Sequence, residues 1–259
     1  MRIDASRTVL TGASTGIGAS LAKLLHARGA RLVLISRKIK TYDLAGVHWI
    51  SADLTKPAER LRAFEEASQH LGGIDVLINN AGVGAYTPTA NIDDSTWDYL
   101  YELNLNAPIH LSRLALPLML AQRRGSIVNI SSIAGLVPLP WFTLYSTTKA
   151  ALLSFTHGLR MELDQTGVTT TAVCPGYVQT PFQANVIVGK PPQLLQRTKR
   201  FAISPEDCAA DILSGIEKDQ RTVVSPASGH LLKTLYFFFP RLIDWQFARY
   251  NRNLEKASN

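Results

Sequence analysis

Tyr145 and Lys149 are the two residues of this chain whose types and spacing most clearly suggest chemistry. They lie four positions apart at the start of a stretch with helical composition, so we expect both side chains on one helix face. A phenol beside an ammonium can act as a general acid and base, because the cation favours the phenolate and lowers the phenol's pKa from about 10. The alternative is an ordinary pair on an exposed helix.

Ser132 could supply a hydroxyl beside this phenol. Residues 127–130 are mostly apolar and β-branched, which predicts a strand ending at Ser131 and Ser132, and a loop rich in glycine and proline leads on to Tyr145. A serine at the end of that strand could hydrogen-bond the substrate oxygen on which the phenol acts.

A glycine-rich turn, TGASTGIG, covers residues 11–18. Residues 7–10 before it predict a short strand, and residues 19–28 after it have the apolar spacing of a helix. Glycines allow the backbone to approach a pyrophosphate, whose charge the helix N-terminus then stabilises. The spacing is G-x-x-x-G-x-G rather than G-x-G-x-x-G. A cofactor site is favoured over a simple tight turn, because a strand and a helix flank the glycines.

Arg37 follows the second predicted strand, residues 31–35, within the sequence Ser36-Arg37-Lys38. Dinucleotide folds usually carry an acidic residue about 20 positions after the glycines to hold the ribose 2′-hydroxyl. Cations stand there in this chain and suit a 2′-phosphate, so NADP(H) is preferred, with NAD(H) as the alternative cofactor. A solvated pair of loop charges is the non-functional interpretation.

Further short apolar runs predict strands at residues 47–51, 75–78, 168–173 and 221–225. They alternate with helical patterns at 57–70, 95–122, 144–163 and from Pro205 onward, with an interruption expected near residues 104–106. This alternation predicts an α/β fold, a Rossmann-like doubly wound parallel sheet with helices on both faces, forming one domain over residues 1–259. Asp53 would lie at the carboxyl edge of the sheet, near an adenine, or else cap the next helix.

The substrate side is expected to be apolar. Residues 176–203 have no clean periodicity and contain several prolines, as functional flaps often do. This flap and the loops at 83–92 and 136–142 offer apolar side chains: Trp141, Phe142, Tyr177, Phe182, Val186, Ile187 and Val188. They favour an apolar or lipid-like carbonyl compound over a phosphorylated sugar, although some could simply pack the flap.

The C-terminal extension, residues 226–259, combines aromatic and basic residues. Its apolar run at 231–240, LLKTLYFFFP, is too short to span a bilayer. From Arg221 onward there are six Lys or Arg and two acids, a balance of +4. Such a segment could contact a membrane peripherally, or its phenylalanines could pack over the flap or against a dimer partner.

Composition narrows the class of protein. The chain has 259 residues, of which 46% are hydrophobic and 18% charged, enough for one large core. Two cysteines do not make a disulfide framework, and the first residues lack the pattern of a secretory leader, so we expect a cytoplasmic protein. The net charge is +7, yet the sequence shows neither a nucleic-acid motif nor zinc-ligand spacing, so we expect no nucleic acid and no metal.

Taken together, the motifs resemble those of the classical short-chain dehydrogenase/reductase family over about residues 6–225. They are Thr11-Gly12-x-x-x-Gly16-Ile17-Gly18, Asn79-Asn80-Ala81-Gly82, Asn104, Ser132, Tyr145-x-x-x-Lys149 and Pro175-Gly176. The resemblance implies hydride transfer between NADP(H) and an alcohol or carbonyl carbon, and assembly as a homodimer or homotetramer through the two long helices. Thr15 departs from the pattern, because many NADP(H)-dependent members carry a cation inside the glycine turn. The alternative is a catalytically silent dinucleotide-binding sensor or scaffold.

The resemblance also implies individual roles. Tyr145 exchanges the proton, Lys149 lowers the phenol's pKa and binds the nicotinamide ribose, Ser132 holds the substrate oxygen, and Asn104 anchors a water that relays protons to Lys149. The expected cofactor contacts are Gly12, Ser14, Thr15, Gly16, Ile17, Gly18, Ser36, Arg37, Asp53, Leu54, Asn80, Ala81, Gly82, Tyr145, Lys149, Pro175, Gly176, Val178 and Thr180. The expected substrate contacts are Ser132, Trp141, Tyr145, Tyr177 and Phe182.

Overall fold

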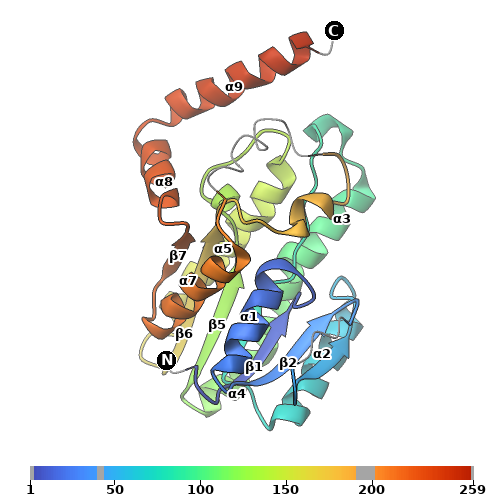
Figure 1. Cartoon of the computed structure of the whole chain (residues 1–259), viewed down its shortest axis with the longest axis vertical. Coiled ribbons are helices and arrows are strands. Elements are labelled where there is room, and N and C mark those ends of the chain that lie inside the picture. Colours follow the sequence, from blue (N-terminus) through green and yellow to red (C-terminus); the bar gives the residue numbers. More distant parts are fainter. Residues whose placement is uncertain (1–2, 40–43, 191–201, 258–259) are drawn as a thin grey trace.

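A parallel β-sheet forms the centre of the molecule in the computed structural model, which describes residues 3–39, 44–190 and 202–257 (Figure 1). The described residues form seven strands: β1 (Arg7–Thr11), β2 (Arg31–Ser36), β3 (His48–Ser51), β4 (Val76–Asn79), β5 (Gly125–Ile130), β6 (Val168–Pro175) and β7 (Thr222–Ser225). Their order is β3-β2-β1-β4-β5-β6-β7, and every neighbouring pair is parallel. The chain order reverses between β1 and β4, where doubly wound folds open a ligand crevice.

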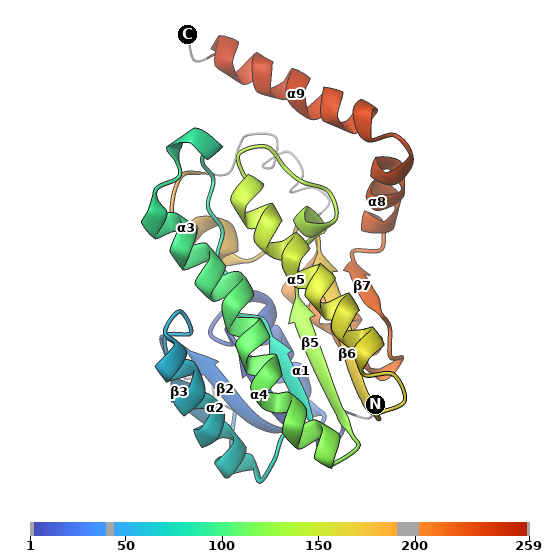
Figure 2. The same cartoon turned by 180° about the vertical axis from the view of Figure 1, so that it is seen from behind.

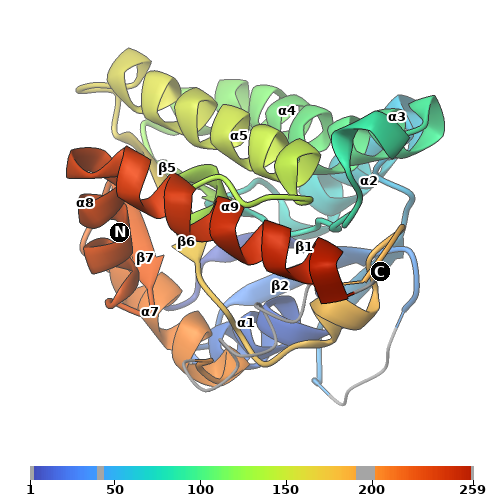
Figure 3. The same ribbon diagram turned by 90° about the horizontal axis from the view of Figure 1, so that it is seen from above.

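Helices cover both faces of this sheet (Figures 2 and 3). On one face, α1 (Gly16–Ala27) packs against α7 (Pro205–Glu217). On the other face lie α2 (Pro57–Leu71), α4 (Ala107–Ala121) and α5 (Thr143–Glu162). The predicted fold class, an α/β doubly wound parallel sheet with helices on both faces, is confirmed.

Alternation along the strands explains the two layers. In β1, Val9 belongs to the core beneath α2, α4 and α5, whereas Leu10 belongs to the core beneath α1 and α7. In β2, Val33 and Leu34 divide in the same way. Successive side chains of a strand point to opposite faces, so a strand that is apolar throughout requires a helical layer on each side.

The predicted helix at 95–122 is divided into three parts. A regular helix, α3 (Asp94–Tyr101), leads into a π-helical turn, η2 (Glu102–Asn106), and α4 continues from Ala107. The interruption expected near residues 104–106 is therefore present as a π turn, a feature common at functional sites. It contains Asn104, whose side chain is fully buried.

Two further helices, α8 (Gly229–Phe238) and α9 (Pro240–Ala257), follow the last strand and extend away from the body of the molecule (Figures 1 and 2). Seen along the sheet, α9 crosses above the end at which the strands finish (Figure 3). None of the described helices is long and apolar enough to cross a membrane. Phe237, Phe238 and Phe239 are exposed, so they do not pack over the described part of the flap of their own chain.

Candidate active site and cofactor cavity

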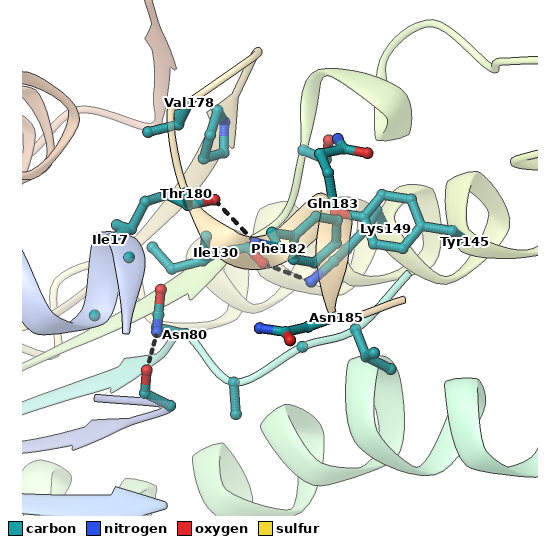
Figure 4. Close-up of a pocket in the computed structure, with 18 of the residues that line it drawn as sticks. Ile17, Asn80, Ile130, Tyr145, Lys149, Val178, Thr180, Phe182, Gln183 and Asn185 are labelled. Atoms are coloured by element: carbon teal, nitrogen blue, oxygen red, sulfur yellow. Dashed lines mark hydrogen bonds between the residues drawn. The ribbon is translucent and has the colours of Figure 1, made fainter. Parts of the chain in front are cut away.

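A cavity of about 970 Å³ opens at the carboxyl ends of the strands. Its walls come from the glycine turn, the ends of β2, β4, β5 and β6, the start of α5, the flap and the C-terminal helices. Figure 4 shows side chains from several of these elements converging on one space. Parallel strands finish at the same edge of a sheet, so motifs far apart in the sequence meet here.

The glycine turn provides a close-fitting cradle. Gly12 and Gly16 have φ values of +66° and +56°, in the region that favours glycine. A Cβ at Gly16 would lie 2.9 Å from Cγ2 of Thr180, and one at Gly18 would lie 2.3 Å from the carbonyl oxygen of Gly12. The residues present therefore fit a dinucleotide, because only glycine leaves the backbone open at the N-terminus of α1.

Asn80 and Thr11 brace this turn. The Thr11 hydroxyl accepts the backbone N–H groups of Asn80 and Ala81, each at 3.0 Å. The Asn80 amide donates to the carbonyl oxygens of Thr11 and Gly12, both at 3.0 Å (Figure 4). Asn80 lines the cavity, but its amide hydrogens serve to join the end of β4 to the turn after β1.

Arg37 lies in the cavity wall with Ser36 and Lys38, at the end of β2. Its guanidinium is exposed and lies over the ring of Tyr99, 5.9 Å from the ring centre. Ala52 and Leu54 line the cavity, whereas the carboxylate of Asp53 accepts hydrogen bonds from the backbone and hydroxyl of Thr55. Asp53 meets neither expectation: it is absent from the described lining of the cavity, and the N-cap position of α2 is Lys56, so its carboxylate only stabilises the turn with Thr55.

Tyr145 and Lys149 share one face of α5, as their spacing predicts, and both side chains are buried. Lys149 Nζ lies 5.7 Å from the centre of the Tyr145 ring and donates to the carbonyl oxygen of Ile130 at 2.9 Å (Figure 4). The expectation that the phenol's pKa is lowered is wrong. Burial raises the pKa of Tyr145 well above its usual value, although a hydrogen bond with Ser132 acts in the opposite direction. Burial also lowers the pKa of Lys149 to about 8.

Ser132 and Asn104 hydrogen-bond backbone groups close to Tyr145 and Lys149. Ser132 lies two residues beyond the end of β5 at Ile130 and caps a 3-10 turn, Ile133–Gly135, where its hydroxyl accepts the N–H of Ala134 at 3.1 Å. The Asn104 amide accepts the N–H of Val83 and donates to the Val83 carbonyl, both at 2.9 Å. A Cβ at Gly82 would lie 3.2 Å from both Asn104 Oδ1 and Lys149 Nζ, so these two groups approach the same glycine.

An aromatic stack encloses the phenol and was not predicted from the sequence. The ring of Phe142 lies between Tyr86 and Tyr145, with ring centres 4.2 and 4.1 Å away. Phe182 of the flap covers the same phenol at 5.7 Å. Both Trp141 and Phe142 were expected to be available to the pocket from this loop, with Trp141 as a substrate contact; the described lining of the cavity contains Phe142 but not Trp141. Trp141 has a φ of +58°, and its carbonyl accepts the N–H of Thr87, so the chain turns there and brings Phe142 inward.

The flap closes against the 84–86 segment. Ile187 donates to the carbonyl of Gly84, and Tyr86 donates to the carbonyl of Val188, both at 2.9 Å. Thr180, Tyr177 and Phe182 line the cavity, as do Pro175, Gly176 and Val178. Residues 191–201 of the flap lie outside the described residues. The sequence also gave no indication that Leu232 and Phe247 of the C-terminal helices reach the cavity wall.

Comparisons with known proteins decide the family. A family model described as short chain dehydrogenase matches residues 6–190. An uncharacterized oxidoreductase of Staphylococcus aureus (strain MRSA252) is 34% identical over 224 residues, which cover 84% of this chain and 93% of that protein. The chain belongs to the short-chain dehydrogenase/reductase family.

Solved structures agree with this assignment. A short-chain dehydrogenase from Streptomyces avermitilis superposes with a TM-score of 0.84 and 25% identity, covering 97% of this chain and 99% of that one. A short-chain dehydrogenase from Burkholderia cenocepacia J2315, solved in complex with NADP, gives a TM-score of 0.80 and 26% identity, covering 95% and 99% of the two chains. The chain is therefore a short-chain dehydrogenase/reductase enzyme, and its cradle is that of a nicotinamide dinucleotide.

Proposed function

We propose that this short-chain dehydrogenase/reductase transfers a hydride between NADP(H) and an alcohol or carbonyl group of an apolar, lipid-like substrate. One observation carries the proposal: the Tyr145 phenol, bonded to Ser132, lies in the same cavity as the glycine cradle and Arg37. A dinucleotide bound in the cradle and an oxygen bound at the phenol would therefore meet in one enclosed space.

The bound nicotinamide supplies the hydride or accepts it. The side chains of the chain handle the proton and the oxygen. Since burial raises the pKa of Tyr145, the phenol is protonated at neutral pH and can donate its proton to the oxygen of a carbonyl substrate. Ser132 hydrogen-bonds the same oxygen, and Lys149, whose pKa is about 8, holds a positive charge close to the phenol at pH 7.

The remaining roles follow from placement. Lys149 is proposed to bind the ribose hydroxyls of the nicotinamide half, and Asn104 to anchor a water that passes protons to Lys149. What supports this proposal is that a Cβ at Gly82 would lie 3.2 Å from both Asn104 Oδ1 and Lys149 Nζ, so the two groups approach the same glycine. Because the Asn104 amide is already bonded to Val83, its orientation is fixed before any ligand arrives.

NADP(H) is the proposed cofactor. Arg37 and Lys38 stand in the cavity wall at the end of β2, where a guanidinium can bind the oxygens of a 2′-phosphate. The described lining of the cavity contains no Asp or Glu, Asp53 included, so it lacks the acidic partner that a free ribose 2′-hydroxyl prefers. The Burkholderia cenocepacia neighbour was solved with NADP, which is consistent with this choice.

The apolar substrate is inferred from the remaining wall of the cavity. Side chains beyond the phenol are mostly apolar: Leu139, Phe142, Phe182, Val186, Leu232 and Phe247. Tyr86 and Gln183 add polar atoms to this wall, but these atoms bond to each other: the Tyr86 hydroxyl donates to Oε1 of Gln183 at 2.6 Å. No Lys, Arg, Asp or Glu is found among the described lining residues of this part, so a phosphorylated sugar would lack a partner there.

Assembly and location complete the proposal. We expect a homodimer or homotetramer formed through the long helices α4 and α5, and we expect the enzyme to work in the cytoplasm. The extension at residues 226–259 is proposed to make peripheral contact with a membrane. The exposed side chains Leu120 of α4 and Met161 of α5 are compatible with contacts between copies.

A cofactor-oxidation screen tests the reaction. The purified enzyme would be mixed with NADPH and a panel of long-chain ketones, aldehydes, steroid ketones and sugar phosphates, and the loss of NADPH absorbance recorded. We expect turnover with apolar carbonyl compounds and none with sugar phosphates. Turnover confined to phosphorylated or charged substrates would contradict the proposed substrate class.

A further inference from the structure

The outer face of the C-terminal arm is an apolar surface outside the catalytic cavity. We define the arm as helices α8 and α9, and its outer face as the exposed residues Leu231, Leu235, Phe237, Phe238, Phe239, Leu242 and Trp245. Phe237 is 77% exposed, the largest value among the exposed large hydrophobic side chains of the described chain. Large apolar side chains gathered in this way mark an interaction surface.

Each helix of the arm has two distinct faces. In α8, Leu231, Leu235 and Phe238 recur at i, i+4 and i+7 and are exposed, whereas Leu232 is partly buried and lines the cavity. In α9, Leu242 and Trp245 are exposed. Residues at such spacings share one side of a helix, so the arm covers the cavity with one side and presents a second apolar side outward.

Phe247 repeats this arrangement in α9. It is partly buried and lines the cavity, although it lies only two positions beyond the exposed Trp245. In Figure 3, α9 crosses the cavity end of the sheet rather than lying against the helices on its faces. The outer face is therefore on the far side of the arm from the catalytic cavity.

The charges of the arm indicate its partner. Its described side chains include three cations, Lys233, Arg241 and Arg249, and one acid, Asp244. Arg249 lies over the ring of Trp245, 5.4 Å from its centre, on the same side of α9. Apolar and aromatic side chains mixed with cations match a bilayer interface, where rings enter the acyl boundary and cations meet anionic headgroups.

We propose that the outer face of the arm docks on an anionic lipid bilayer. A second copy of the chain fits the charges less well, because the described side chains of the arm carry a net positive charge and a two-fold contact would bring two such faces together. Anionic headgroups neutralise the cations of every docked molecule.

Docking would also orient the cavity. Leu232 and Phe247 line the cavity on the inner side of the same arm. When the enzyme is docked on a bilayer by the outer face of the arm, its cavity therefore lies on the opposite side of the arm from the bilayer, which is the source of an apolar substrate. This part rests on the proposed substrate class, and the docking itself deepens the proposed membrane contact by naming its surface and the charge of its lipid.

Vesicle co-sedimentation of the full chain tests the docking. Vesicles of phosphatidylcholine alone would be compared with vesicles containing about 30% phosphatidylserine, at low and high salt. We expect sedimentation with the anionic vesicles only, weakening as salt screens the cations. The assay needs neither substrate nor turnover, so it can fail or succeed independently of the proposed reaction.

Two variants identify the surface. Phe237→Ser with Phe238→Ser removes rings of the outer face, and Arg241→Glu with Arg249→Glu reverses its charge. Each is expected to lower the vesicle partition coefficient at least about tenfold. The matched controls, Trp97→Ser on α3 and Lys218→Glu after α7, change exposed side chains of the body and should bind like the parent.

NADPH binding and circular dichroism would establish that each variant folds. Sedimentation velocity without lipid measures the oligomeric state, and so tests whether the outer face is instead an interface between copies of the chain. If the parent never binds vesicles, or if the arm variants bind as well as the parent, the proposal is wrong. If the phenylalanine variant instead converts a dimer to a monomer while no form binds lipid, the outer face is an interface between copies and the proposal is overturned.

Discussion

The side chain of Asn104 is bonded to both backbone groups of Val83, 21 residues earlier in the chain. Its Oδ1 accepts the N–H at 2.9 Å, and its Nδ2 donates to the carbonyl oxygen at 2.9 Å. One buried amide thereby fixes the segment after β4 against the π turn between α3 and α4. The backbone beside the catalytic pair is held by this contact before any ligand binds.

Replacing Asn104 should therefore affect both stability and turnover. Asn104→Ala leaves the N–H and carbonyl of Val83 buried without these partners, which lowers the free energy of unfolding by about 2–5 kcal/mol. The control is Asn106→Ala in the same π turn, where the amide is exposed, and about 1 kcal/mol or less is expected. Urea denaturation measures the free energy of unfolding of both variants. Equal losses for the two variants would contradict the bracing role of Asn104.

The cradle predicts a difference between two glycines with positive φ. Gly16→Ala places a Cβ 2.9 Å from Thr180, whereas Gly29→Ala meets nothing within 4 Å. Both variants carry backbone strain of about 1 kcal/mol. Only Gly16→Ala should weaken NADPH binding, by tenfold or more, in a fluorescence titration. Similar dissociation constants for the two variants would show that the turn is not the cofactor cradle.

Arg37 predicts the cofactor preference. The parent should use NADPH with a higher kcat/KM than NADH, and Arg37→Asp should shift the ratio toward NADH by roughly 10- to 100-fold, the range expected for a lost charge-assisted hydrogen bond. Arg31→Asp, at the opposite end of the same strand, is the matched control. The proposed contact between Arg37 and the 2′-phosphate would be wrong if the parent prefers NADH, or if Arg37→Asp leaves the ratio of the two kcat/KM values unchanged.

Lys149 predicts a pH dependence of stability. Burial lowers its pKa from 10.5 to about 8 in the folded chain, so between these values the unfolded chain binds more protons than the folded one. The free energy of unfolding therefore rises with pH across this window, and below pH 8 the buried charge destabilises the fold in full. The total contribution is about 3 kcal/mol.

Lys149→Met removes this titration. At pH 7 the variant should be more stable than the parent, and the difference should shrink as the pH rises from 8 to 10. Lys218→Met, which changes an exposed side chain, should follow the parent. Chemical denaturation at a series of pH values provides the measurement. A constant difference between parent and Lys149→Met over this range would show that Lys149 does not titrate as proposed.

Much of the fold could be predicted because its signals are local. The apolar runs that form β1, β2 and β4 were recognised within a residue or two of their ends, and the glycine turn was recognised between a strand and a helix. The shared helix face of Tyr145 and Lys149 follows from their spacing alone.

The environment of the site could not be predicted in the same way. The stack of Tyr86 on Phe142 joins two loops, and nothing in either loop specifies its partner. The predicted direction of the Tyr145 pKa is wrong because a spacing rule includes the neighbouring cation but not burial, which is the largest cause of the shift. That Phe142 lines the cavity and Trp141 does not depends on the positive φ of Trp141, which is uncommon for a side chain of that size.

Hydride transfer with proton donation by Tyr145 is most directly tested with NADPH deuterated at C4, using each stereoisomer in turn. With a carbonyl substrate from the screen, mass spectrometry should find one deuterium on the product's carbinol carbon with one isomer only. Tyr145→Phe should bind NADPH as the parent does yet lose roughly 10²- to 10⁴-fold in kcat. A product without deuterium from either isomer, or a Tyr145→Phe enzyme within about tenfold of the parent, would contradict the mechanism.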